Sequence, residues 1–211
     1  QINIKTTTAL FLLFVVGCTP SIVGLESINE EGFSYPDLSE KNYCRGTGYI
    51  TSKGNVSGRL NLAFTSSKNL TYVEFKDLIG RKTLFLVISN NTIDAWDIRN
   101  NRKYDQESLL LAFPFFELIK PNDLTNFLWG KIPKTFMESD NISKNDKIKN
   151  GQIQFSSHQT ENGILINFVS FNIKDEDQKI NLFVENRDFD MQYPHLIKKI
   201  PQSVIPVTES L

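Results

Sequence analysis

Alternating apolar and polar residues in the first half of the chain constrain the fold more than any other feature. Leu60, Leu62 and Phe64, for example, alternate with polar or small neighbours. A period of two places every second side chain on the same face of a β-strand. Asn90-Asn91 is a typical turn between two such strands. Residues 43–98 are therefore predicted to form an antiparallel meander with one buried face.

Two segments break this alternation and have helical spacing instead. Asp105 is placed to cap a helix over residues 106–112, and Asn122 is placed to cap a helix over residues 123–129. Gly130 follows the second segment as a C-terminal stop signal. The apolar faces of both helices are expected to pack against the sheet, because nothing else in the chain offers them cover.

Strand-like patterns resume in the second half of the chain, over residues 152–156, 164–173 and 179–185. Residues 192–211 contain three prolines and are predicted to form an extended tail. The expected fold class is mainly β with a smaller α component. The expected extent of the single folded domain is 43–190, with a C-terminal tail over 191–211.

The N-terminal region has the pattern of a bacterial lipoprotein. An apolar run over residues 8–17 ends at Cys18, and the last four residues of this segment, VVGC, form a lipobox. The run is shorter than the roughly 20 residues that a membrane-spanning helix needs. Residues 1–17 are therefore predicted to be a signal peptide, Cys18 the lipidated residue, and 18–42 a lipidated tether. The alternative is a secretory signal whose cleavage site happens to lie beside a cysteine.

Charge and cysteine content exclude several classes of function. Removal of residues 1–17 takes away Lys5, one of 23 Lys and Arg residues, and leaves 22 against 24 Asp and Glu, a formal charge of −2. Nucleic-acid binding and electrostatic membrane binding are therefore both disfavoured. Cys44 is the only cysteine besides Cys18, so no intramolecular disulfide is expected in the mature chain, and a buried thiol is the simplest role.

Residues for catalysis or metal binding are nearly lacking. His158 and His195 are the only histidines, and neither has a partner at the spacing of a triad or a metal site. Both are expected to be ordinary surface residues. Gly46-Thr47-Gly48 lacks the third glycine and the helix of a dinucleotide-binding loop, so small residues in a strand explain it better. We expect no enzyme activity, no cofactor and no metal.

Three segments carry a resemblance to the LolB family of outer-membrane lipoproteins. They are RGTGYI over residues 45–50, YVEFKDLIGRKTLFL over 72–86, and IKPNDLTNFLWGKIP over 119–133. Together with the lipobox they occur in the family's order and spacing. The resemblance is good over residues 40–133, whereas the rest of the chain matches only as strands.

The resemblance implies an unclosed antiparallel β-barrel, or half-barrel, whose concave face is covered by helices and encloses an apolar cavity for acyl chains. The sheet is expected to have about nine to eleven antiparallel strands. Sixteen phenylalanines and the strand LFLVI, apolar on both faces, are consistent with such a cavity, or simply with a phenylalanine-rich core. The expected cavity residues are Leu62, Phe64, Leu84, Leu86, Phe127 and Leu128.

The resemblance also implies a membrane-touching loop, because Leu78, Ile79 and Gly80 occupy the position of the family's apolar tip. Ile79 stands at the place of the family's key leucine. The alternative is a loop folded back onto the edge of the sheet.

The function implied by this family is that of a receptor on the periplasmic face of the outer membrane. It would accept lipoproteins from a periplasmic LolA-like carrier and insert them into the membrane. Its other partners would be the acyl chains of the lipoproteins and membrane lipid, and the receptor itself is expected to be a monomer. Thr19, next to Cys18, also favours the outer membrane, because an Asp there commonly signals inner-membrane retention. Two alternatives remain: a lipoprotein of the same fold that binds another hydrophobic ligand, and a non-catalytic interaction protein of the cell envelope. The ligand-binding lipoprotein would need only the apolar cavity. The interaction protein would need neither the cavity nor an exposed loop tip.

Overall fold

The computed structural model describes residues 36–54, 57–133, 151–160, 163–173 and 177–207. In this part of the chain ten strands, two α-helices and two short 3₁₀ turns follow one another. The strands are β1 (Tyr43–Lys53), β2 (Gly58–Ser67), β3 (Thr71–Lys76), β4 (Lys82–Ile88), β5 (Ile93–Asp97), β6 (Arg102–Tyr104), β7 (Gly151–Thr160), β8 (Gly163–Ile173), β9 (Gln178–Phe189) and β10 (Ile205–Pro206). The helical elements are α1 (Gln106–Ala112), η1 (Pro114–Glu117), α2 (Pro121–Leu128) and η4 (Pro194–Leu196).

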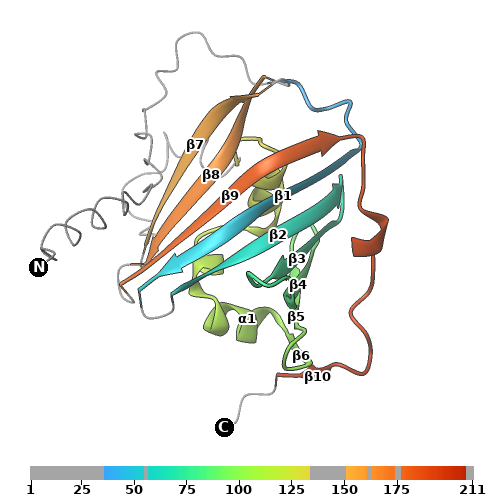
Figure 1. Cartoon of the computed structure of the whole chain (residues 1–211), viewed down its shortest axis with the longest axis vertical. Helices are drawn as coiled ribbons and strands as arrows, with labels where there is room; N and C mark the ends of the chain where they lie inside the picture. Colours follow the sequence, from blue (N-terminus) through green and yellow to red (C-terminus); the bar gives the residue numbers. More distant parts are fainter. Residues whose placement is uncertain (1–35, 55–56, 134–150, 161–162, 174–176, 208–211) are drawn as a thin grey trace, which may run out of the picture.

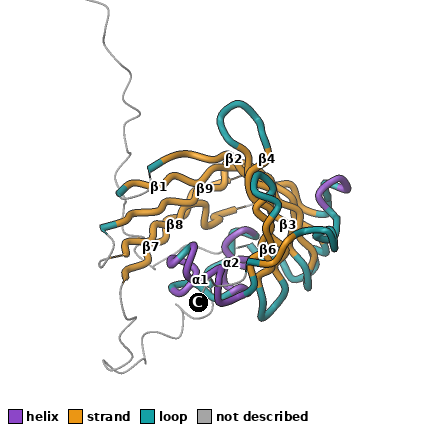
Figure 2. The backbone as a smooth tube through the Cα atoms, turned by 90° about the horizontal axis from the view of Figure 1, so that it is seen from below, coloured by secondary structure: helices purple, strands orange, loops and turns teal. Residues whose placement is uncertain are grey.

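All ten strands belong to one curved sheet in the order β10-β6-β5-β4-β3-β2-β1-β9-β8-β7 (Figure 1). The sheet bends around the helices without closing, and β7 and β10 are its two edges (Figure 2). The predicted half-barrel with helices on the concave face is thereby confirmed. One detail differs, because β10 pairs with β6 in parallel, so the sheet is not antiparallel throughout.

The concave face holds the main apolar core. Phe64 on β2 and Val73 on β3 point inward, as their alternation predicted. Leu86 on β4, a strand whose sequence is apolar on both faces, also points inward, and all three pack with Leu124 and Phe127 of α2. β3 and β4 pair so that Val73 lies opposite Leu86. Each position adjacent to an inward residue therefore faces the convex side of the sheet.

Helix α1 starts where the sequence predicts, because the Asp105 carboxylate accepts a 2.9 Å hydrogen bond from the backbone N–H of Ser108. The predicted start of the second helix is wrong. Asn122 lies inside α2, whose first residue is Pro121 and whose N-cap is Lys120. Proline suits the first position of a helix because its missing N–H would have no partner there. Gly130, with φ +84°, ends the helix as expected.

A β-bulge between β1 and β9 ties the sheet to the helical layer. The register of the pair shifts between Thr47 and Gly48, after which Arg187 of β9 points to the concave side. Its guanidinium donates to the backbone oxygens of Leu128 (2.7 Å), Phe127 (3.1 Å) and Ile166 (2.6 Å). Two of these carbonyls are at the C-terminal end of α2, where a buried cation is favourable.

Gly46 and Gly48 lie on β1, as their interpretation as small strand residues predicts. A Cβ atom on Gly46 would lie within 2.5 Å of the Phe64 ring, and one on Gly48 would lie 2.0 Å from the backbone oxygen of Phe183. Glycine at these two positions therefore allows the close approach of strands at the bend.

The C-terminal segment crosses the convex side of the sheet, as the red trace in Figure 1 shows. The Thr65 hydroxyl accepts a 3.1 Å hydrogen bond from the backbone N–H of Tyr193. Leu196 and Val204 are buried, and Ile205 begins the two-residue strand β10. This segment was predicted only as an extended tail. Its described part, up to residue 207, is mostly extended but packs against the sheet.

Candidate functional site

The hairpin between β3 and β4 exposes two large aliphatic side chains. Leu78 is 71% exposed and Ile79 is 75% exposed, the two highest values among the large apolar residues described. Leu111 on α1 follows at 66%. The loop is therefore not folded back onto the edge of the sheet. Exposed neighbouring aliphatic side chains of this size are a typical mark of a contact surface.

Asp77 organises this hairpin. One carboxylate oxygen accepts hydrogen bonds from the backbone N–H groups of Ile79 (3.1 Å) and Arg81 (2.9 Å), and the other accepts from the Arg81 side chain at 2.7 Å. The backbone oxygen of Asp77 accepts from Gly80, whose φ of +84° favours glycine. The tip is thus held in one conformation, with Leu78 and Ile79 directed outward.

The Asp77 carboxylate stays charged because of these bonds. Partial burial acts to raise its pKa, but the hydrogen bonds and the charge of Arg81 outweigh that effect and hold the pKa below its usual value. The Asp77–Arg81 pair is consequently intact at neutral pH and contributes no net charge to the tip.

The six predicted cavity residues come together on the concave side. Five of them, Leu62, Phe64, Leu86, Phe127 and Leu128, are buried in the main core, and Leu84 is partly buried against it. In this conformation they contact one another and the surrounding protein. The expectation that they hold acyl chains therefore stays a prediction, and the phenylalanine-rich core is the simpler description of the structure as it stands.

Aromatic side chains fill the space between the sheet and the helical layer. The rings of Phe115 and Phe116 in η1 lie 4.2 Å apart, and Phe115 is 5.4 Å from Phe171 of β8. Phe113 contacts both η1 rings edge-on. An acyl chain could enter this region only if η1 or the adjacent helices moved away from the sheet.

A cavity of about 330 Å³ lies at the end of β3 opposite the hairpin. Its lining is mostly polar and includes three lysines; the lining residues are Leu38, Ser39, Lys41, Ser67, Lys68, Asn122, Thr125, Asn126, Trp129 and Lys131. None of the six predicted cavity residues contributes to it. A polar, cationic lining does not suit the hydrocarbon part of an acyl chain.

A buried carboxylate beneath the hairpin is a feature that the sequence did not reveal. Glu74 sits between Val73 and Phe75, faces the convex side and has a side chain only 1% exposed. Alternation places it on the outer face, where solvent exposure would be the usual expectation. Its burial depends on Lys198, which comes from 124 residues further along the chain, so no local signal could have indicated it.

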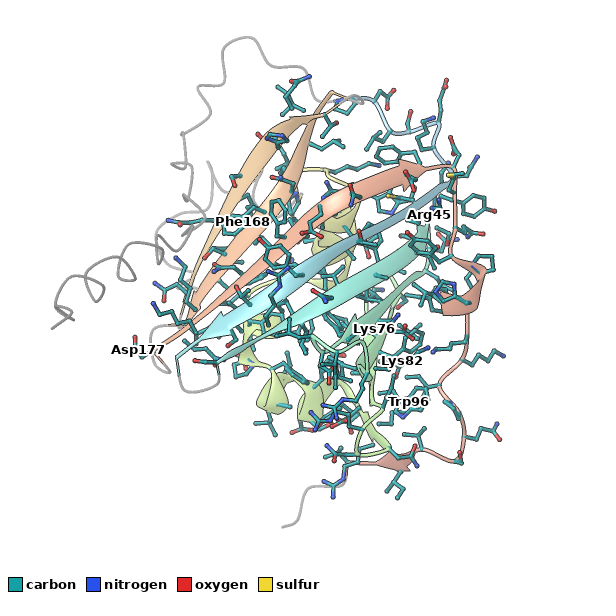
Figure 3. All side chains as sticks on the ribbon, in the orientation of Figure 1. Arg45, Lys76, Lys82, Trp96, Phe168 and Asp177 are labelled. Atoms are coloured by element: carbon teal, nitrogen blue, oxygen red, sulfur yellow. The ribbon has the colours of Figure 1, made fainter. Side chains whose placement is uncertain are left out.

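Three lysines surround Glu74. Lys82 lies 2.8 Å and Lys198 3.3 Å from one carboxylate oxygen, and Lys76 lies 3.4 Å from the other. Burial acts to raise the pKa of Glu74, but the hydrogen bonds and charges of Lys82 and Lys198 outweigh this and lower it. Figure 3 shows Lys76 and Lys82 close together on the convex side, above Trp96.

Cys44 and the two histidines have the environments that the sequence predicts. Cys44 is fully buried, and burial raises the pKa of its thiol to about 12, so the thiol is neutral and unreactive. His158 and His195 are exposed.

The described ranges contain no group of His, Cys, Asp and Glu that could hold a metal ion. In the same ranges, no helix combines the length and apolar character needed to cross a membrane. Cys18 lies outside the described residues.

Comparison with known proteins assigns no family to this chain. No protein-family model matches the chain, and no curated protein matches its sequence. The structure is similar to that of a DUF1329 family protein from Desulfovibrio piger, with 7% identity and a TM-score of 0.42 over 73% of this chain and 88% of that one. It is also similar to an uncharacterized conserved protein from Thermus thermophilus, with 10% identity and a TM-score of 0.37 over 82% and 93%. Neither likeness assigns a family or a function.

Proposed function

We propose that this protein is a lipid-anchored receptor that accepts the acyl chains of lipoproteins from a periplasmic carrier and delivers them to the outer membrane. The observation that carries the proposal is the hairpin tip, where Leu78 and Ile79 are held outward by the bonds of Asp77. The half-barrel architecture and the resemblance to the LolB family support it. The anchor would be Cys18.

The energetics of lipid transfer explain why such a tip is needed. At about 0.8 kcal/mol per CH₂ group, exposing one acyl chain of common length to water costs on the order of 10 kcal/mol. Cargo must therefore pass directly from protein to bilayer. Leu78 and Ile79 each gain roughly 1.5 to 3 kcal/mol when they enter lipid, which suffices for a transient contact but not for permanent attachment.

Acyl binding on the concave side requires a conformational change in this proposal. The predicted cavity residues are packed in the structure, so α1, η1 or α2 would have to move from the sheet to admit a chain. Phe127 and Leu128 of α2 belong to both the core and the predicted cavity. They would exchange protein contacts for cargo contacts, which keeps the apolar surface covered in both states.

The packed core favours one alternative, an envelope protein whose apolar interior serves only as core. This protein would still touch the membrane or a partner through Leu78 and Ile79 but would carry no acyl chain. A transfer assay separates the two functions, because only the first includes uptake of cargo.

The decisive experiment measures both uptake and insertion. A lipoprotein loaded on a matched carrier is mixed with the protein, and liposomes are added. Ile79→Glu is expected to take up cargo normally but to insert it poorly, because a carboxylate is costly to place in the bilayer. Ile205→Glu is the matched control, since Ile205 is similarly exposed (62%) but lies in β10, away from the hairpin and the helices. Normal insertion by Ile79→Glu, or failure of the wild type to accept cargo, would refute the receptor function.

Anchoring is tested separately. Mass spectrometry of the mature protein should find an acylated N-terminal Cys18, and Cys18→Ala should move the protein from the membrane fraction to the soluble fraction. An unmodified N-terminus at another residue would show that the anchor proposal is wrong.

A further inference from the structure

The lysines around Glu74 carry more positive charge than the carboxylate needs. Three ammonium groups lie within 4 Å of one buried carboxylate, and their side chains remain 39% (Lys76), 47% (Lys82) and 30% (Lys198) exposed. The cluster therefore has a formal charge of +2, from three ammonium groups and one carboxylate. Repulsion among three ammonium groups is unfavourable unless further anions approach.

This charge lies directly behind the apolar tip. Lys76 and Lys82 pair with each other across β3 and β4 and are the residues that flank the loop from Asp77 to Arg81. Asp77 and Arg81 neutralise each other at 2.7 Å, so the loop itself adds no charge. Leu78 and Ile79 thus protrude from a neutral loop whose stem is cationic.

The third lysine is brought to the stem by the tertiary fold. Lys198 belongs to the C-terminal segment, and its ammonium group also lies 4.6 Å from the centre of the Phe85 ring and 5.9 Å from that of Trp96. These contacts hold its side chain in place on the convex side. A cationic site assembled from two distant parts of the chain is consistent with a requirement for charge at this position.

We propose that Lys76, Lys82 and Lys198 bind the phosphate groups of anionic phospholipids at the surface of the membrane that Leu78 and Ile79 enter. An apolar wedge bordered by lysines is the arrangement that attaches proteins peripherally to anionic bilayers. The formal charge of −2 over residues 18–211 provides no general attraction, so the preference arises from this local cluster. The inference rests on the proposed contact of the tip with the membrane and adds the class of lipid.

The test is vesicle flotation of the full chain with Cys18→Ala, so that an acyl anchor does not contribute. Vesicles of phosphatidylcholine alone are compared with vesicles of equal parts phosphatidylcholine and phosphatidylglycerol. We expect the protein to prefer the anionic vesicles and to lose that preference at high salt. Lys76→Gln and Lys82→Gln should each weaken binding to anionic vesicles by about fivefold, with little change on neutral vesicles.

Two control variants separate local charge from folding and from overall charge. Lys82→Arg keeps the charge and should bind like the wild type. Lys103→Gln removes one charge from a pair with Asp94, which lies opposite Val87 at the far end of β4, and should have little effect. Equal binding of the wild type to both vesicles, or equal losses for Lys82→Gln and Lys103→Gln, would overturn the inference.

The outcomes also distinguish this inference from the proposed function. If Ile79→Glu leaves binding to neutral vesicles unchanged, the membrane contact of the tip is wrong. If Ile79→Glu abolishes that binding but the lysine variants have no effect on anionic vesicles, the contact stands and only the lipid preference is wrong.

Discussion

Leu86 and Ile79 are chemically similar residues seven positions apart, yet they occupy opposite environments. Leu86 points into the concave core and is 1% exposed, whereas Ile79 is 75% exposed at the hairpin tip. Apolar surface in the core stabilises the fold by leaving water during folding. Apolar surface at the tip leaves water only when something else binds there. The comparison teaches that the residues that stabilise the fold are separate from those of the proposed membrane contact, so the two groups can be changed independently.

The largest expected effect is that of a core truncation. Phe127→Ala removes a fully buried ring from α2 and should lower the free energy of unfolding by about 3 to 5 kcal/mol. Urea unfolding followed by circular dichroism measures it. A loss below about 1 kcal/mol would mean that α2 is already loosely packed, which would favour a cavity that opens easily.

Arg187→Met is expected to have the next largest effect. The carbonyl oxygens of Phe127, Leu128 and Ile166 would each lose the hydrogen bond that Arg187 donates, while that of Phe127 would keep the one from the backbone N–H of Gly130. The expected loss in the free energy of unfolding is about 2 to 3 kcal/mol. Asn186→Met on the same strand is the comparison, because Asn186 is exposed and makes only a 3.4 Å contact with Thr47. Equal losses for the two variants would argue against a specific role of Arg187.

Glu74→Gln tests the buried carboxylate beneath the hairpin, on the convex side of the sheet. At neutral pH it should lower the free energy of unfolding by about 1 to 3 kcal/mol, because three lysines lose their anion. The folded state lowers the pKa of Glu74 from an ordinary value of 4.5, so the unfolded state takes up a proton first as the pH falls. The contribution of Glu74 is therefore complete above about pH 4.5 and is lost as the pH falls toward the folded-state pKa.

The measurement is the free energy of unfolding of the wild type and of Glu74→Gln at a series of pH values from neutral to acidic. It tests whether the contribution of Glu74 to stability falls on acidification. The difference in stability between the two proteins should shrink on acidification. A difference that is constant or grows would mean that the lysines do not stabilise the charged form of Glu74.

The smallest expected effect on stability belongs to the tip itself. Ile79→Ala should change the free energy of unfolding by less than about 0.5 kcal/mol, as for most exposed positions. Binding to vesicles should nevertheless weaken. A destabilisation comparable with that of Phe127→Ala would show that the tip packs against the protein, and the contrast with the core would disappear.

Most strands and both helices could be predicted from local patterns, because strand alternation and helix capping act over a few residues. The half-barrel arrangement of these elements was implied only by the resemblance to the LolB family. The inward-facing set around Phe64 and Leu86, the Asp105 cap and the Gly130 stop are examples. The three-residue strand β6 was not predicted, because so short a segment has no period to detect. The start of α2 was predicted two residues too late because Asn122 is a good capping residue, whereas the helix begins at Pro121 after Lys120 as N-cap.

The candidate site was only partly predictable for a similar reason. Leu78 and Ile79 stand out in the sequence as aliphatic residues among charges. The burial of Glu74, by contrast, depends on Lys198 and on the path of the C-terminal segment over the convex face. Whether the concave side holds acyl chains depends on a movement of the helices, which residue patterns do not encode.

A fluorescence experiment tests the membrane contact of the tip most directly. A polarity-sensitive dye is attached to Ile79→Cys, or to Leu111→Cys as reference, in a protein that also carries Cys18→Ser. Cys44 does not interfere, because it is fully buried and its pKa is raised to about 12. On addition of vesicles, the dye at position 79 should shift to shorter wavelength and become inaccessible to an aqueous quencher, while the dye at position 111 stays accessible. No change at position 79, or equal changes at both positions, would contradict the account.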